Sequence, residues 1–64
     1  MIYILQRIGL ESYETVGAYT NRVLLKEDAD KMVELQHCTK TDLRAMAFIQ
    51  NSENLIEIIE YDDI

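Results

Sequence analysis

Proline is absent from this sequence, and glycine occurs only at positions 9 and 17. Disordered segments are typically rich in proline, glycine and serine and poor in aliphatic residues, whereas 48% of this chain is hydrophobic. The composition therefore predicts a folded protein. With 64 residues the chain has room for one compact domain, and we assign residues 1–64 to it.

Cysteine and histidine are nearly absent, since Cys38 and His37 are the only ones. A single cysteine excludes a disulfide within the chain, and one cysteine with one histidine cannot supply the ligands of a structural metal site. We expect neither a metal nor another cofactor. A chain of this size buries only about 60% of its unfolded surface, so the remaining supports are a dense core and self-association.

The N-terminus has neither a basic segment nor a long apolar run. The sequence therefore predicts no signal peptide and no membrane-spanning helix. One free cysteine is typical of a reducing compartment. Together these features predict a cytoplasmic protein.

Basic residues are scarce: six Lys and Arg stand against twelve Asp and Glu, which gives a net charge of −6. Such a charge repels nucleic acids and anionic membranes and favours a basic protein as the partner. The six basic residues are dispersed along the chain. We therefore expect no basic patch and no direct binding of nucleic acid.

The acidic residues are bunched, with four between residues 27 and 34 and five between residues 53 and 63. We expect a partner-binding surface formed by Glu27, Asp28, Asp30, Glu34, Glu57, Glu60, Asp62 and Asp63. The alternative is a solvated helix face and a charged tail, with early acids such as Asp28 stabilising the helix N-terminus. The two groups form one surface only if the last strand ends beside the helix.

Runs of β-branched and aromatic residues predict strands over residues 2–8, 13–20 and 55–61. The short connection between the first two predicts an antiparallel hairpin. Gly17, in the middle of the second strand, predicts a bulge or a close backbone approach.

Apolar residues at helical spacing predict a helix from about residue 24 to about residue 36 and a second one from residue 41 to residue 50. The segment from Thr39 to Asp42 offers an N-cap for the second helix. The alternative is one longer helix, although the threonines between the two favour a break.

These elements predict an α+β fold: a three-stranded antiparallel sheet in the order strand, strand, helix, helix, strand, with one or two helices packed on one face. The last strand is expected to pair with the first. Because the helices cover only one face, an apolar patch on the bare face would mark an interface with a partner or a second copy. The residues expected there are Tyr3, Leu5, Tyr19, Ile59 and Tyr61.

The sequence contains no motif that predicts catalysis. His37 and Cys38 are the only nucleophile-and-base pair by composition, but adjacent helical residues point about 100° apart. The residues after Asp28 and Asp30 lack the glycine of a calcium-binding loop, and there is no phosphate-binding glycine-rich loop. We expect no catalytic residues and no enzymatic activity.

The stretch Tyr13-Glu14-Thr15-Val16-Gly17-Ala18-Tyr19-Thr20, after an N-terminal strand, resembles the second strand of small phage and bacterial strand-strand-helix-strand proteins. A second resemblance is to the Dmd antitoxin family of T-even phages. It rests on Leu24-Leu25-Lys26-Glu27-Asp28, a helical stretch, Ala47-Phe48-Ile49 and a polar turn before an apolar strand. Members of that family bind and block a host RNase toxin. The acidic C-terminal tail departs from the family pattern, so no binding residues are carried over.

Two functions follow as predictions. The first is a non-enzymatic inhibitor or antitoxin, phage-encoded and acting in the host cytoplasm, whose carboxylates occupy the basic groove of a host nuclease or other defence protein as a mimic of DNA or RNA. The second is a small homodimeric structural or assembly module with no inhibitory role.

Overall fold

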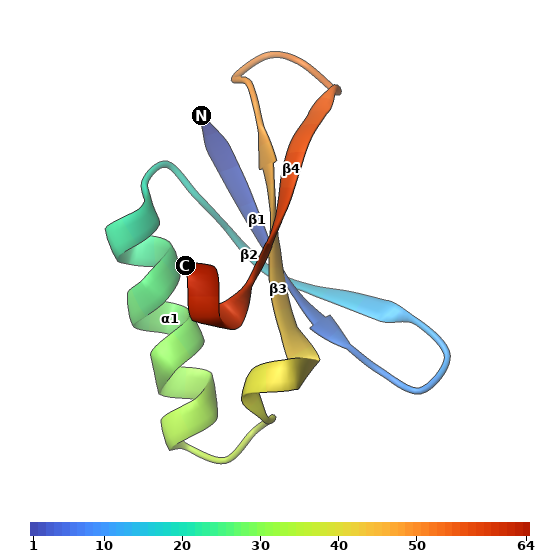
Figure 1. Cartoon of the computed structure of the whole chain (residues 1–64), viewed down its shortest axis with the longest axis vertical. Coiled ribbons are helices and arrows are strands. Elements are labelled where there is room, and N and C mark those ends of the chain that lie inside the picture. Colours follow the sequence, from blue (N-terminus) through green and yellow to red (C-terminus); the bar gives the residue numbers. More distant parts are fainter.

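The computed structural model describes all 64 residues and shows an α+β fold in which one helix packs on an antiparallel sheet (Figure 1). Along the chain the elements are β1 (Ile2–Ile8), β2 (Tyr13–Tyr19), α1 (Arg22–Glu34), the 3₁₀ turn η1 (Lys40–Asp42), β3 (Leu43–Phe48), β4 (Leu55–Glu60) and the 3₁₀ turn η2 (Tyr61–Asp63). The four strands form one sheet in the order β2-β1-β3-β4. α1 packs on β1 and β2, and η2 packs on β3 from the same side.

The prediction of a second helix over residues 41–50 is wrong, because residues 43–48 form β3. Leu43, Ala45 and Ala47 are fully buried and the residues between them are half-buried, which is the two-residue period of a strand. Leucine, alanine and methionine favour helices when judged alone, and tertiary packing overrides that preference here. The segment predicted to cap that helix caps the 3₁₀ turn η1 instead, where the Thr39 backbone N–H donates to the Asp42 carboxylate at 3.1 Å.

The missed strand also changes the sheet, which has four strands instead of three. β3 lies between β1 and β4, so the last strand pairs with β3 and not, as predicted, with the first. The β3–β4 connection includes Asn51 in the left-handed backbone region, at φ 65°. Asparagine tolerates that conformation better than most residues.

The predicted hairpin of β1 and β2 is confirmed. Leu5 pairs with Gly17 and Gln6 pairs with Thr15, which leaves Val16 as an extra residue in a bulge. A Cβ atom on Gly17 would lie 2.7 Å from the hydroxyl oxygen of Tyr19. Gly17 therefore lies next to a bulge and also permits a close approach. The group that approaches is the Tyr19 side chain and not, as predicted, another backbone segment.

The predicted first helix is confirmed as α1. The Asn21 side chain caps it by accepting a hydrogen bond from the Leu24 N–H at 3.0 Å. Its first turn contains no acid, so the expected pairing of early acids with the helix N-terminus is absent. After the last helical residue, Glu34, Gln36 adopts the left-handed region at φ 60°. The His37 N–H donates to the Met32 carbonyl at 3.0 Å, as in a Schellman motif.

No helix in the structure has the length and apolar character that crossing a membrane requires.

The core between α1 and the sheet is thin. Its buried members are Leu5, Leu25, Ala29, Leu43, Ala45, Ala47 and Ile59. Ala29 on α1 and Ala45 and Ala47 on β3 have small side chains, which let the layers approach closely. Only Leu5, Leu25 and Leu43 are both large and fully buried, so the domain depends on few apolar contacts.

The residues predicted for the bare face of the sheet lie on its covered face. Leu5 is 0% exposed and Ile59 is 3% exposed, and the other three residues predicted for the bare face pack against the core. All five therefore lie on the face that α1 and η2 cover. Alternation shows which residues share a face, but not which face receives the helix. The uncovered side, called the open face below, carries Ile2, Ile4, Met46, Phe48, Leu55 and Ile58.

The thin core predicts a large effect from one truncation. Leu25→Ala should lower the free energy of unfolding by about 2–5 kcal/mol, because it removes one of three large buried side chains. Leu24→Ala, the same change at the neighbouring position where the side chain is 45% exposed, should cost less than about 1 kcal/mol. Chemical denaturation of both variants checks this. Equal losses would contradict the packing of α1 described above.

Candidate partner-binding surfaces

The structure contains no pocket and no group of three or more His, Cys, Asp or Glu side chains placed to hold a metal ion. The candidate functional sites are therefore surfaces. Two of them have a distinct chemistry: the acidic residues around α1 and η2, and the open face of the sheet.

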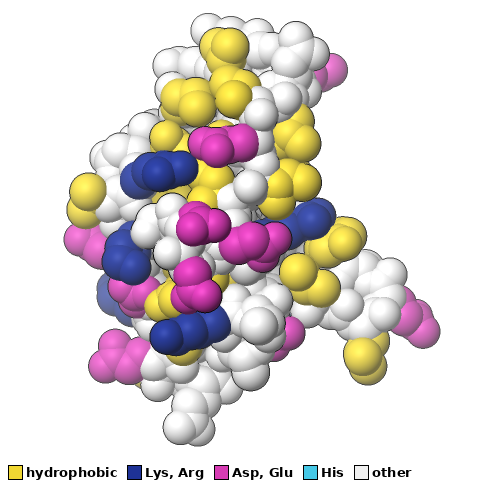
Figure 2. Space-filling model, in the orientation of Figure 1, with side chains coloured by type: hydrophobic (Ala, Val, Ile, Leu, Met, Phe, Trp, Pro, Cys, Tyr) yellow, Lys and Arg dark blue, Asp and Glu magenta, His cyan; other side chains and the backbone are white.

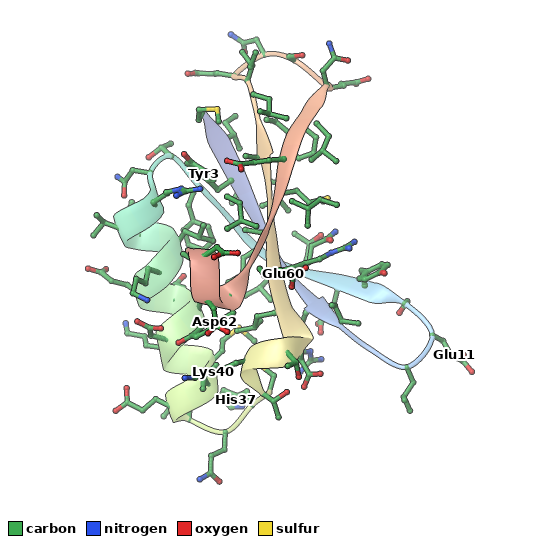
Figure 3. All side chains as sticks on the ribbon, viewed as in Figure 1. Tyr3, Glu11, His37, Lys40, Glu60 and Asp62 are labelled. Carbon is green, nitrogen blue, oxygen red and sulfur yellow. The ribbon has the colours of Figure 1, made fainter.

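The C-terminal turn docks on the helix through Tyr61. Its hydroxyl donates a hydrogen bond to Asp30 of α1. Lys26 and Lys40 place their ammonium nitrogens 5.7 and 5.6 Å from the centre of the Tyr61 ring, within the range of cation–π attraction. The last strand thus ends beside the helix, and Figure 3 shows Asp62 of the C-terminal turn next to α1.

Three of the eight predicted partner-binding acids are already engaged within the chain. Asp28 accepts a hydrogen bond of 2.6 Å from the Tyr19 hydroxyl. Asp30 accepts from Tyr61 and lies 3.7 Å from the Lys26 nitrogen. Glu57 lies 3.4 Å from an Arg22 nitrogen. These three carboxylates hold α1 and the sheet together.

The other five predicted acids are exposed and have no ion pair or hydrogen bond within the chain: Glu27, Glu34, Glu60, Asp62 and Asp63. Glu27 and Glu34 are seven residues apart on α1, so they lie on one side of the helix with Asp30 between them. Asp62 and Asp63 follow the Tyr61 contact. We call Glu27, Glu34, Asp62 and Asp63 the carboxylate surface. Glu60 is not part of it, because it pairs with Arg44 and so lies on the open face of the sheet.

Lysines interrupt the carboxylate surface. Lys26 and Lys31 lie on α1, and Lys40 begins η1. Figure 2 shows acidic and basic side chains intermixed over the helix and the C-terminal turn. The surface is therefore negative in sum but mixed in detail, and the bunching of acids in the sequence overstates its local charge.

The two tyrosine hydroxyls that bind α1 are perturbed in the same direction. Burial, followed by the hydrogen bond and charge of Asp28, raises the pKa of Tyr19 from 10.0 to about 12. The hydrogen bond to Asp30, followed by burial, raises the pKa of Tyr61. In each case a nearby carboxylate favours the protonated phenol that donates to it.

His37 is exposed, and neither its side chain nor that of Cys38 takes part in a hydrogen bond. Cys38 is half-buried and packs against the core. Burial, together with the charge of Asp42, raises the pKa of its thiol, whereas a nucleophilic cysteine requires a lowered pKa. The pair therefore has the arrangement of a packing residue beside an exposed imidazole.

The open face is the surface that sequence reasoning missed. Leu55 and Ile58 are each 47% exposed, and the other four members of the open face are half-buried. At one end of this face the Arg44 guanidinium donates to the Gln6 side chain at 3.2 Å and lies 4.0 Å from the centre of the Tyr13 ring. Alternation along β1 puts Ile2 and Ile4 on one face of the sheet, but the exposure of that face depends on where α1 packs.

Comparison with protein-family models, curated proteins and solved structures gives no match to this chain.

The contact between Tyr19 and Asp28 predicts a titration result. Asp28→Asn should lower the pKa of Tyr19 from about 12 without returning it to 10.0, because burial, the larger cause, remains. Spectrophotometric titration of tyrosinate, with Tyr19→Phe to identify the signal, measures this. Since the folded pKa lies above the unfolded one, the stabilising contribution is complete below pH 10.0 and is lost as the pH rises toward about 12.

Two further variants make the titration specific. Glu27→Gln removes the charge next to Asp28 on α1 and should leave the pKa of Tyr19 unchanged. Gly17→Ala should lower the pKa of Tyr19, because its new Cβ atom would displace the hydroxyl from Asp28. If Asp28→Asn and Glu27→Gln shift the titration equally, the hydrogen bond is not the cause.

Proposed function

We propose that this chain is a non-enzymatic binding protein that blocks a basic protein, as a phage-encoded inhibitor or antitoxin blocks a host nuclease or defence factor in the host cytoplasm. The observation that supports this function best is the Tyr61–Asp30 contact. It docks the turn that carries Asp62 and Asp63 against α1 at Asp30. The result is an exposed surface whose carboxylates have no partner within the chain.

The binding residues in this proposal are the four members of the carboxylate surface. Asp28, Asp30 and Glu57 are already bonded within the chain, so using them would first break contacts that hold the helix. The free carboxylates are available to arginine and lysine side chains of a partner. A net charge of −6 accelerates the encounter with a basic surface and makes it sensitive to salt.

The spacing of the acids narrows the kind of partner. Seven helical residues advance about 10.5 Å, and Glu27 and Glu34 are the free carboxylates over that length. A nucleic-acid strand of duplex DNA carries one phosphate per ~3.4 Å. The surface is too sparse, and too interrupted by lysines, to imitate a long duplex. It suits a basic active-site opening that binds a few phosphates, such as that of a ribonuclease.

The proposal predicts that the protein captures a basic partner in a salt-sensitive way, and that the loss of affinity depends on which carboxylates are removed. Tagged protein should retain a basic nucleic-acid enzyme from a bacterial lysate at low salt and release it at high salt. The double variant Asp62→Asn with Asp63→Asn should weaken retention of the identified protein on the order of tenfold at low salt. Surface plasmon resonance with the purified partner measures the change.

The matched control is Glu11→Gln with Glu53→Gln, which removes the same charge from the two loops between strands. Figure 3 shows Glu11 at the tip of the β1–β2 hairpin, away from Asp62 and α1. This control should change affinity by no more than about twofold. Equal effects of the two double variants would mean that net charge alone acts and that the carboxylate surface is not the site.

A further inference from the structure

We propose that the open face is the interface of a homodimer, in which the sheets of two copies pack against each other and the helices lie on the outside. This goes beyond the proposed inhibition and does not depend on it. The argument rests on the exposure of the face, its size, its charge and the shape of the two edge strands.

The open face lacks the second layer that an amphipathic sheet requires. Small domains bury each apolar face of a sheet against another layer, and α1 is the only helix available. A folded monomer of 7.5 kDa exposes about 4,250 Å² by the usual scaling with mass, whereas this chain exposes 4550 Å². The chain therefore exposes about 300 Å² more surface than is usual for its mass.

The size of the face suits a sheet-on-sheet contact. Four strands about 4.8 Å apart, each about six residues long at ~3.3 Å per residue, span a flat area of about 400 Å². Two copies contribute about 800 Å² of flat area, and the relief of the side chains adds accessible surface to it. The total approaches the ~1,200 Å² at which stable interfaces begin.

Charge favours a second copy as the occupant. Apart from Glu60, the free carboxylates lie on the opposite side of the sheet or in the loops between strands. The open face carries one cation, Arg44, beside this one carboxylate. Two copies of charge −6 therefore meet with least repulsion at this face. A two-fold interface must be self-complementary, and a face with one charge of each sign satisfies that requirement. A basic partner would be attracted to the other side.

The edge strands disfavour the alternative of pairing edge to edge. β2 has an extra residue at Val16, and β4 has one at Ile56, where Ala47 pairs with Glu57 but Phe48 pairs with Leu55. A bulge in an edge strand twists it and interrupts its hydrogen-bonding groups, which hinders addition of another strand. Both edges of this sheet are interrupted in this way, so the face is the better contact.

Sedimentation equilibrium of the full chain at micromolar concentration tests the dimer, with Ile58→Glu as the interface variant. The wild type should be a dimer whose affinity is unchanged or higher as salt rises, because its contact is apolar between like-charged copies. Ile58→Glu should raise the dissociation constant more than about 100-fold, since it buries an unpaired carboxylate in each copy. Circular dichroism confirms that the variant is folded.

Val23→Glu is the matched control, because it makes a similar change on α1, where the side chain is 68% exposed. It should leave the dimer intact. A monomeric wild type overturns the proposal, and so does a dimer that both variants weaken equally. Neither result bears on the salt-sensitive capture of a basic protein, because that capture uses the opposite side of the sheet and is tested separately.

Discussion

One helix covers one face of a four-stranded sheet, and most properties of this protein depend on that imbalance. α1 lies over β1 and β2, and the short turn η2 packs on β3. The cover is completed by Ile59 and Tyr61, which lie at the junction of β4 and η2. The chain supplies no second layer for the other face, and six apolar residues remain on it.

The same imbalance explains why part of the acidity is structural. The helix is joined to the covered face by few large apolar side chains, and two tyrosine–carboxylate hydrogen bonds add to them. Tyr19 ends β2 and donates to Asp28, and Tyr61 begins η2 and donates to Asp30. Each bond is charge-assisted, which makes it stronger than a bond between neutral groups. A cluster of acids in a sequence therefore does not measure the acidity available to a partner.

Sequence patterns were sufficient for β1, β2, α1 and β4, because each has a clear period and local signals at its ends. They failed at β3, where Leu43, Ala45 and Met46 all favour helices and the short run fits either period. Only pairing with β1 and β4, both distant in sequence, identifies it as a strand. The exposed face could not be predicted for a related reason, since it is fixed by helix docking through contacts such as Tyr61 to Asp30, 31 residues apart.

In the two proposals the open face forms the dimer and the carboxylate surface binds the basic partner. Packing through the open face would remove the apolar residues from water and leave a carboxylate surface on each outer side of the dimer. Two such surfaces per particle give the dimer twice the charge of one chain, which increases long-range attraction to a basic partner. The closely mixed lysines limit this gain at short range. Specificity would then come from the positions of Glu27, Glu34, Asp62 and Asp63. The positions of Asp62 and Asp63 relative to α1 depend on the contacts of Tyr61 with Asp30, Lys26 and Lys40.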